Sequence, residues 1–285
     1  MRLRAGRVKG GWSRIITGEA VLIDISGKVA VVTGAGRGIG AVLADRFARE
    51  GCKVALWERE DDALEAVAAE LRSHGHDVEA IHCDVSSEAD VKSAVTRTTT
   101  RFGAIDILLN NAGVGAPALL CDESVDAWDS TFATNTRGVF LCAREVANVM
   151  KRQKRGRIIN AASFASIIPS SPMGSYAASK AAVTSLTRVL AAELSPWDIT
   201  VNCYAPGMIP SRLSGYADVS PERRAQLWDT LTIPQWGDPN EVADLCIFLA
   251  SERAGYITGT MIDVSGGKYA VQFPQLARAA ATVGQ

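Results

Sequence analysis

The stretch Val29-Ala30-Val31-Val32-Thr33-Gly34-Ala35-Gly36-Arg37-Gly38-Ile39-Gly40 decides the fold. Its four leading apolar residues predict a strand that is buried on both faces. Apolar residues at helical spacing over residues 39–49 predict a helix directly after the glycines. Glycines permit a tight turn and close approach of a ligand to the backbone. A helix that starts there directs free N–H groups and its positive dipole end at an anion. We therefore interpret this stretch as a phosphate-binding turn.

The same alternation of strand and helix continues along the chain. Further strands are predicted at residues 54–57, 79–82, 107–109, 157–160, 200–203 and 261–264, and further helices at residues 63–71, 89–102, 128–150, 176–194 and 241–249. Such alternation predicts an α/β fold, a single doubly wound domain with a parallel sheet of about seven strands. We expect a basic extension over residues 1–24 and one dinucleotide-binding domain over residues 25–285. Residues 206–237 form a long loop, which we expect to be a substrate loop because long loops in compact domains are usually functional or disordered.

Composition excludes several classes of function. The chain has 30 Lys and Arg against 31 Asp and Glu, a formal net charge of −1. This balance gives no electrostatic footprint for nucleic acid or for an anionic membrane. The chain also lacks a run of ~18 uncharged apolar residues that could span a membrane. The six cysteines show neither C-x-x-C pairs nor His at metal-ligand spacing. We expect buried, reduced thiols, a cytoplasmic location and no metal. The basic start is interpreted as a flexible extension, with a transit peptide as the alternative.

A carboxylate lies at the position that contacts the adenosine ribose in dinucleotide-binding folds. Glu58 ends the second predicted strand, 18 residues after Gly40. A carboxylate at about this distance accepts hydrogen bonds from the ribose hydroxyls and repels a 2′-phosphate. Arg37 and Arg59 favour the opposite preference, since guanidinium groups bind a 2′-phosphate. Because the carboxylate occupies the reading position itself, we predict NAD as the cofactor, with NADP as the alternative.

Several motifs in order make the resemblance specific. The glycine turn matches T-G-x-x-x-G-x-G, Asp84-Val85 follows the third strand, and Asn110-Asn111-Ala112-Gly113 follows the fourth. Asn135, Ser163, a Y-x-x-x-K motif from Tyr176 to Lys180, and Pro206-Gly207 come next. With these motifs the sequence resembles the short-chain dehydrogenase/reductase family, from about residue 26 to residue 267. The resemblance implies a Rossmann-type fold and a nicotinamide-dependent oxidoreductase.

The resemblance also implies roles for individual residues. The catalytic tetrad would be Asn135, Ser163, Tyr176 and Lys180. The cofactor would contact Gly34, Arg37, Gly38, Ile39, Gly40, Glu58, Arg59, Asp84, Val85, Asn111, Ala112, Gly113, Tyr176, Lys180, Pro206, Gly207, Ile209 and Ser211. Ser211 stands where the family often has Thr, which keeps the hydroxyl.

The expected chemistry is reversible interconversion of an alcohol and a carbonyl without a metal. Tyr176 is the expected general acid and base. Its ordinary pKa is about 10, so work near neutrality needs a fall of about 2 to 3, worth about 3–4 kcal/mol. Lys180 lies one helical turn later on the same face, and its ammonium favours the phenolate. Ser163 would donate to the substrate oxygen. By resemblance, Asn135 would anchor a water that links Lys180 to solvent.

The substrate pocket is predicted to be mostly apolar. Ser163, Phe164, Met173, Tyr176 and Met208 are the expected substrate contacts, and the walls would also include Gly115, Ala165, Leu213 and Trp228, with Arg212 as the one obvious cation. We therefore expect an uncharged or weakly polar substrate: a secondary alcohol, a ketone, a sugar or polyol, or an acyl thioester.

The sequence leaves two alternative functions open and predicts an oligomer. An NADPH-dependent 3-oxoacyl-[acyl-carrier-protein] reductase shares this motif set, and a non-catalytic dinucleotide-binding regulator would need a broken tetrad, whereas all four residues are present. The predicted helices at residues 128–150 and 176–194 have wide apolar or small-residue faces. In the family their counterparts pair across a dimer interface, so we expect a homotetramer or a homodimer.

Overall fold

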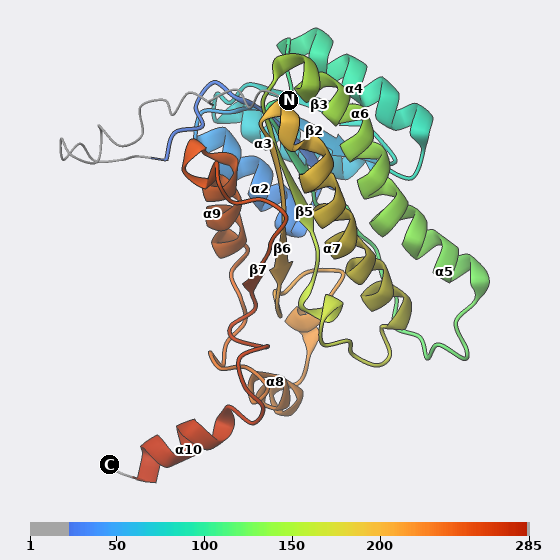
Figure 1. Cartoon of the computed structure of the whole chain (residues 1–285). Helices are drawn as coiled ribbons and strands as arrows, with labels where there is room; N and C mark the ends of the chain where they lie inside the picture. The colour runs from blue at the N-terminus through green and yellow to red at the C-terminus, as the bar shows by residue number, and fades with distance from the viewer. Residues whose placement is uncertain (1–22, 284–285) are drawn as a thin grey trace, which may run out of the picture.

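Seven parallel strands form one sheet in the order β3-β2-β1-β4-β5-β6-β7 in the computed structural model, which describes residues 23–283 (Figure 1). The strands are β1 (Val29–Thr33), β2 (Lys53–Glu58), β3 (Val78–His82), β4 (Ile107–Asn110), β5 (Gly156–Ala161), β6 (Ile199–Pro206) and β7 (Met261–Val264). The strand order reverses direction between β1 and β4. In open α/β sheets this switch point, at the carboxyl ends of the strands, is where ligands bind. The predicted doubly wound fold is confirmed.

Helices cover both faces of the sheet. They are α2 (Gly38–Arg49), α3 (Asp61–Ser73), α4 (Glu88–Phe102), α5 (Val125–Phe132), α6 (Gly138–Gln153), α7 (Gly174–Leu194), α8 (Pro221–Trp228), α9 (Pro239–Ala250) and α10 (Gln275–Val283). The apolar sides of α2, α3 and α9 pack on one face, around Phe47, Leu64 and Val242. The other face is covered by α4, α6 and α7, around Val91, Val146 and Ala191. Both faces of the central strands are therefore buried, as their continuous apolar sequences predict.

The predicted helix at residues 128–150 is wrong in one respect, because it is two helices. A five-residue π-helix, Ala133–Arg137, separates α5 from α6. Single π turns of this kind often occur at functional sites. The one here carries Asn135, which is completely buried.

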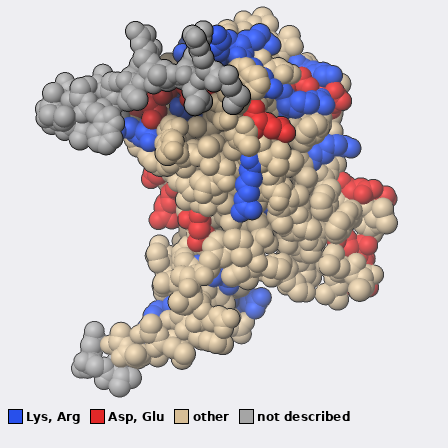
Figure 2. Space-filling model, in the orientation of Figure 1, with Lys and Arg blue, Asp and Glu red and all other residues tan. Residues whose placement is uncertain are grey.

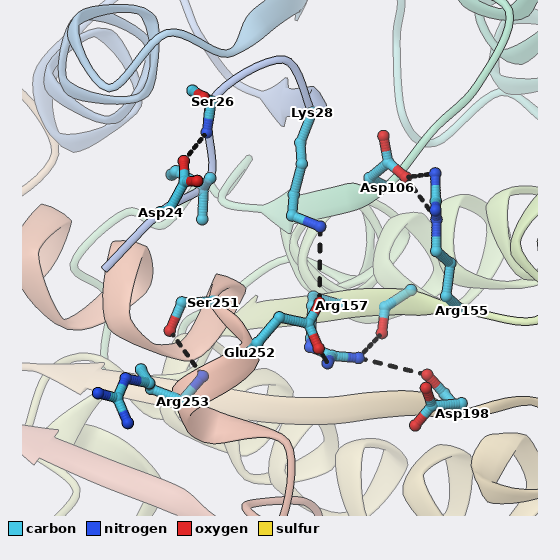
Figure 3. A network of polar contacts seen from close by, with 12 residues as sticks. Asp24, Ser26, Lys28, Asp106, Arg155, Arg157, Asp198, Ser251, Glu252 and Arg253 are labelled. Carbon is cyan, nitrogen blue, oxygen red and sulfur yellow. Dashed lines mark hydrogen bonds and ion pairs between the residues drawn. The ribbon is translucent and has the colours of Figure 1, made fainter. Parts of the chain in front are cut away.

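Ion pairs and hydrogen bonds connect residues at the amino ends of the strands, at the edge of the sheet opposite the switch point (Figure 3). Arg157 on β5 is 6% exposed and donates to the carbonyl oxygens of Gly156 and Asp198. Glu252 accepts from Arg157 at 3.4 Å and pairs with Lys28 at 3.6 Å. A buried guanidinium is stable only when it is paired and hydrogen-bonded. This network therefore stabilises the fold and lies away from the expected chemistry.

The structure bears on the predictions for the amino-terminal extension and for the cysteines. The basic extension lies almost wholly outside the described residues, as does Gln285. All six cysteines are free, and five are buried as expected, but Cys121 is exposed.

Within residues 23–283 no helix is long and apolar enough to cross a membrane, and no cluster of His, Cys, Asp and Glu could hold a metal ion. The carboxyl-terminal tail forms α10, which points away from the sheet (Figure 1).

Candidate active site

A cleft of about 450 Å³ opens at the carboxyl ends of the strands. Sixteen of the predicted cofactor residues line it: Gly34, Arg37, Gly38, Ile39, Gly40, Glu58, Arg59, Asp84, Val85, Asn111, Ala112, Gly113, Tyr176, Lys180, Pro206 and Ser211. These residues come from loops spread over most of the sequence. The fold therefore brings the glycine turn and the Y-x-x-x-K motif to one cavity.

The glycine turn has the backbone that a phosphate site requires. Gly34 and Gly38 have φ values of +64° and +54°, in the left-handed region that favours glycine. A Cβ on Gly40 would lie 1.9 Å from the carbonyl oxygen of Gly34, so only glycine fits there. A Cβ on Gly38, by contrast, would meet only the Cβ of Ser211, at 3.8 Å. The amino end of α2 therefore faces open space, which fits a bound diphosphate.

Three strands are tied together behind this turn. The Thr33 hydroxyl accepts the N–H groups of Asn111 and Ala112, each at 3.0 Å. The Asn111 amide donates to the Thr33 carbonyl oxygen at 3.1 Å and accepts from the Tyr204 hydroxyl at 2.9 Å. These bonds join β1, β4 and β6 at the switch point, so the floor of the cleft is held rigidly.

Glu58 lies at the predicted reading position, and its carboxylate is held by the backbone. It accepts the N–H groups of Gly36 at 3.1 Å, Arg59 at 2.9 Å and Glu60 at 3.1 Å. The residue is 8% exposed. Three N–H donors stabilise the negative charge. The charge of Glu58 is therefore a fixed feature of the cleft wall.

Charged side chains crowd this end of the cleft. Arg37 forms an ion pair with Glu60. The hydrogen bond from Arg37 lowers the pKa of Glu60, and the charges of Arg212 and Arg59 lower it further. Arg212 also lines the cleft. The expectation that Arg212 serves the substrate pocket is therefore not supported by its surroundings, which are those of the adenosine end.

Tyr176 and Lys180 lie one turn apart on α7, and both line the cleft. The Lys180 ammonium is 5.9 Å from the centre of the Tyr176 ring and donates to the Ala161 carbonyl oxygen at 2.8 Å. Burial lowers the pKa of Lys180 to about 8. Burial also raises the pKa of Tyr176, and a hydrogen bond with Ser163 opposes that rise only in part. The expected fall in the tyrosine pKa is therefore absent from the protein alone, because desolvation outweighs the favourable contacts.

Ser163 stands beside Tyr176 at the end of β5. It is 3% exposed, and its hydroxyl accepts the N–H of Ala165 at 3.2 Å, so it caps the short helix Phe164–Ser166. The Tyr269 hydroxyl donates to the Ser163 carbonyl oxygen at 3.4 Å. The position of Ser163 is therefore set by β5 and by the carboxyl-terminal tail together.

The Asn135 side chain is used within the protein. Its oxygen accepts the Val114 N–H at 2.8 Å, and its nitrogen donates to the Val114 carbonyl oxygen and the Ser179 hydroxyl. A Cβ on Gly113 would lie 3.3 Å from the Lys180 nitrogen and 3.4 Å from the Asn135 oxygen. Glycine at position 113 therefore leaves a small space between these two polar atoms.

Other predicted residues lie elsewhere. Met208 and Ile209 are 5% and 4% exposed and pack in the protein interior, and Gly207 packs so closely on Ser265 that a Cβ would lie 2.5 Å from it. Phe164 and Ala165 are also buried. Gly115 does lie at the site, since a Cβ placed on it would be 2.9 Å from the Tyr176 ring and 3.2 Å from the end of the Met173 side chain. Trp228 packs edge-on against Trp236 and does not line the cleft.

Sequence reasoning missed several residues of the cleft. Glu60, Cys83, Val114, Thr134, Ala161, Ala162 and Tyr204 line it without having been predicted. Glu60 and Cys83 are next to predicted residues at strand ends, so strand-end position was the available signal. Tyr204 is a core tyrosine of β6, and nothing local in the sequence marks its contact with Asn111.

Comparison with known proteins gives consistent results. Residues 34–268 match the family model described as Enoyl-(Acyl carrier protein) reductase. The 3-oxoacyl-[acyl-carrier-protein] reductase FabG of Staphylococcus epidermidis is 37% identical over 243 residues, which are 85% of this chain and 99% of that protein.

Solved structures are equally similar. A short-chain type dehydrogenase/reductase from Mycobacterium marinum is 35% identical with a TM-score of 0.81, over 88% of this chain and 98% of that one. A gluconate 5-dehydrogenase from Burkholderia cenocepacia, in complex with NADP and tartrate, is 32% identical with a TM-score of 0.84, over 87% of this chain and 98% of that one.

Proposed function

Because this chain belongs to the short-chain dehydrogenase/reductase family, we propose that Asn135, Ser163, Tyr176 and Lys180 are its catalytic tetrad. The chain is an NAD(P)-dependent oxidoreductase that acts on CH–OH groups. One observation carries the assignment of the tetrad: the hydroxyl-bearing ring of Tyr176 and the buried ammonium of Lys180 share a cleft with the glycine turn. The cleft thus joins a dinucleotide site to a proton donor.

The protein's part in the reaction is to bind, orient and move a proton. The bound nicotinamide supplies the chemistry of hydride transfer. Tyr176 gives a proton to the carbonyl oxygen in reduction and takes it from the hydroxyl in oxidation. Ser163 is within hydrogen-bond reach of Tyr176, so its hydroxyl holds the same substrate oxygen. Two donors at one oxygen stabilise the charge that develops there.

Lys180 returns the proton to Tyr176, and Asn135 holds the water that connects Lys180 to solvent. The space beside Gly113 is bordered by the Lys180 nitrogen and the Asn135 oxygen. A buried water needs two or more polar partners, and these two atoms satisfy that requirement. We assign this space to the water of the relay that the family resemblance implies.

NAD is the proposed principal cofactor, supported by the fixed carboxylate of Glu58. A 2′-phosphate would approach a charge that three backbone N–H groups hold in place. NADP is the alternative, supported by Arg37, Arg59 and Arg212 in the same cleft.

The substitution Glu58→Gln tests this preference. It removes the repelling charge, so the ratio of kcat/KM with NADPH to that with NADH should rise about tenfold, the effect of ~1.4 kcal/mol. Glu65→Gln is the matched control, since Glu65 is exposed and pairs with Arg72 on α3, away from the cleft lining. Steady-state rates with both cofactors give the ratio. An unchanged or lower ratio in Glu58→Gln would contradict the NAD assignment.

The proposed substrate is a small, uncharged alcohol or ketone. Gly115 lines the cleft beside the Tyr176 ring, Leu213 also lines the cleft, and Leu119, Leu120, Ile167 and Ile168 are exposed on the segments that follow β4 and β5. We infer from these apolar residues that the substrate end of the cleft disfavours a highly charged substrate.

The 3-oxoacyl-[acyl-carrier-protein] reductase activity is the second candidate, supported by the 37% identity to FabG. Charge near the cleft opposes it. Residues 115–136 contain Asp122, Glu123, Asp126 and Asp129 but no Lys or Arg, and Figure 2 shows acidic side chains gathered over α5. A phosphopantetheine arm is anionic and would be repelled there.

A substrate panel separates the two candidates. Secondary alcohols and polyols would be supplied with NAD+ and with NADP+, ketones and a 3-oxoacyl-phosphopantetheine thioester would be supplied with NADH and with NADPH, and absorbance of the reduced nicotinamide would be followed. We expect turnover of uncharged alcohols or ketones. Exclusive turnover of the thioester with NADPH would establish the second candidate, and turnover of only highly anionic acids would contradict both.

A homotetramer in the cytoplasm is proposed for the assembly and location. Phe140 on α6 and Val189 on α7 are 42% and 54% exposed, which supports a partner surface on these helices. Six free cysteines fit a reducing compartment.

A further inference from the structure

Arg212 is a guanidinium in the cleft without a partner. It is exposed, it lines the cleft beside Ser211 and Leu213, and it makes no ion pair or side-chain hydrogen bond with any residue that the structure describes. It belongs to the lid segment, the residues 206–237 that follow β6. Its charge nevertheless reaches Glu60, which follows β2 at the adenosine end of the cleft. Arg212 therefore lies within electrostatic range of the opposite wall without being bonded to it.

The backbone of the lid segment fixes this position. The Ser214 hydroxyl accepts the N–H of Ser211 at 2.9 Å and donates to the Ile209 carbonyl oxygen at 2.9 Å. This closed turn brings Ser211 to the glycine turn, where its Cβ is 3.8 Å from the place of a Cβ on Gly38. The residue after Ser211 thus starts directly across from the amino end of α2.

Three arginines, Arg37, Arg59 and Arg212, line this end of the cleft opposite three carboxylates, Glu58, Glu60 and Asp84. Glu58 is satisfied by backbone N–H groups, and Glu60 is paired with Arg37. Arg59 and Arg212 form no ion pair within residues 23–283. Guanidinium groups form strong, often bidentate, hydrogen bonds with phosphate. Two guanidiniums without an ion pair in this cleft are therefore available to phosphate groups of a ligand.

We propose that Arg212 is a phosphate clamp, through which the lid segment closes on the phosphate groups of the bound dinucleotide. This inference rests on the proposed function for the identity of the ligand. The ligand's phosphate is either the diphosphate, which NAD and NADP share, or the 2′-phosphate of NADP.

The experiment compares Arg212→Ala and Arg212→Lys with the wild-type protein. Dissociation constants for NADH and for NADPH are measured by fluorescence of the reduced nicotinamide at several salt concentrations. Loss of one charged contact should weaken binding about five- to tenfold and flatten the salt dependence, and Lys should restore part of the affinity. Arg223→Ala is the matched control, because Arg223 is on the lid helix α8 and its guanidinium donates to Gln226.

The two cofactors distinguish the two phosphates. Weaker binding of both cofactors by Arg212→Ala assigns the diphosphate, and weaker binding of NADPH alone assigns the 2′-phosphate. Wild-type affinity of Arg212→Ala for both, or an equal loss in Arg223→Ala, would overturn the clamp while leaving the proposed function intact. A wild-type protein that binds neither cofactor would remove the proposed function as well.

Discussion

Burial acts on Tyr176 and Lys180 in opposite directions. It raises the pKa of the phenol and lowers the pKa of the ammonium to about 8. Both groups are thereby moved toward their neutral forms. The residues of the chain alone keep Tyr176 protonated at neutral pH, which suits the acid that carbonyl reduction requires. Oxidation needs the phenolate, and the positive charge of an oxidised nicotinamide is what would favour it.

Lys180 makes stability depend on pH. Its pKa is about 8 in the folded protein and 10.5 in the unfolded chain, so between these values the unfolded chain binds more protons. The free energy of unfolding should therefore rise with pH across this window, and Lys180 should contribute about 2 kcal/mol between pH 8 and pH 10. Urea titrations of wild type and Lys180→Met at both pH values measure the difference.

The variant itself is the control for other groups that titrate in this range. Lys180→Met should lack this rise while retaining every other pH effect. An identical pH dependence in the two proteins would show that the ammonium is not desolvated as described.

Sequence patterns identified Tyr176 and Lys180, but they did not predict the direction in which the pKa of Tyr176 is shifted. Spacing on a helix is local, so four residues suffice to place Lys180 near Tyr176. The pKa values depend on what surrounds the pair, including the Ala161 carbonyl oxygen on β5. Arg212 was likewise noticed, but its neighbour Glu60 is 152 residues away along the chain. No local pattern reports contacts of that kind.

At the scale of single elements, the two ends of β5 have different roles: the amino end belongs to the ion-pair network, and the carboxyl end leads to the proposed active site. Its amino end holds Arg157 in the ion-pair network, and Ser163 follows its carboxyl end near Tyr176. The two ends of one strand thus serve different purposes, as expected for a sheet whose ligands bind at the carboxyl ends.

Two substitutions on this segment should have opposite signatures. Arg157→Ala removes the donor to the carbonyl oxygens of Gly156 and Asp198 and should lower the free energy of unfolding by about 2 kcal/mol, with kcat/KM nearly unchanged. Ser163→Ala should lower kcat about 100-fold with a stability change of about 1 kcal/mol or less. Thermal unfolding and steady-state rates on both proteins check this. A large loss of activity in Arg157→Ala at a temperature where it stays folded would contradict the separation.

Elements with a clear period were predicted well, and the interruption of one helix was not. Residues 128–150 carry apolar residues at helical spacing throughout, with no proline inside. The π-helix at Ala133–Arg137 coincides with bonds from Asn135 to Val114 and Ser179. Tertiary contacts of this sort override local periodicity.

At the scale of the whole molecule, helices α6 and α7 lie side by side on one face of the sheet (Figure 1). Their outer sides expose Phe140 and Val189. A single sheet buried on both faces does not need these side chains in its core, so they are available to a second copy of the chain.

Charge on this surface should therefore change the assembly. Val189→Glu should shift a tetramer or dimer toward the monomer, since burying an unpaired carboxylate costs several kcal/mol. Sedimentation velocity on both proteins measures the state. Leu276→Glu is a control at another exposed apolar position, on α10. A wild-type protein that sediments only as a monomer would overturn the assembly, as would an unchanged oligomer in Val189→Glu.

The central claim is that Tyr176 delivers the proton at a cleft that also binds a dinucleotide. Tyr176→Phe removes one oxygen and keeps the ring that packs against Gly115. Turnover of an accepted alcohol or ketone and binding of NADH would be measured on the same sample of this variant. We predict that kcat falls about 1,000-fold or more while the dissociation constant for NADH stays within twofold. Tyr176→Phe with wild-type kcat would contradict the account.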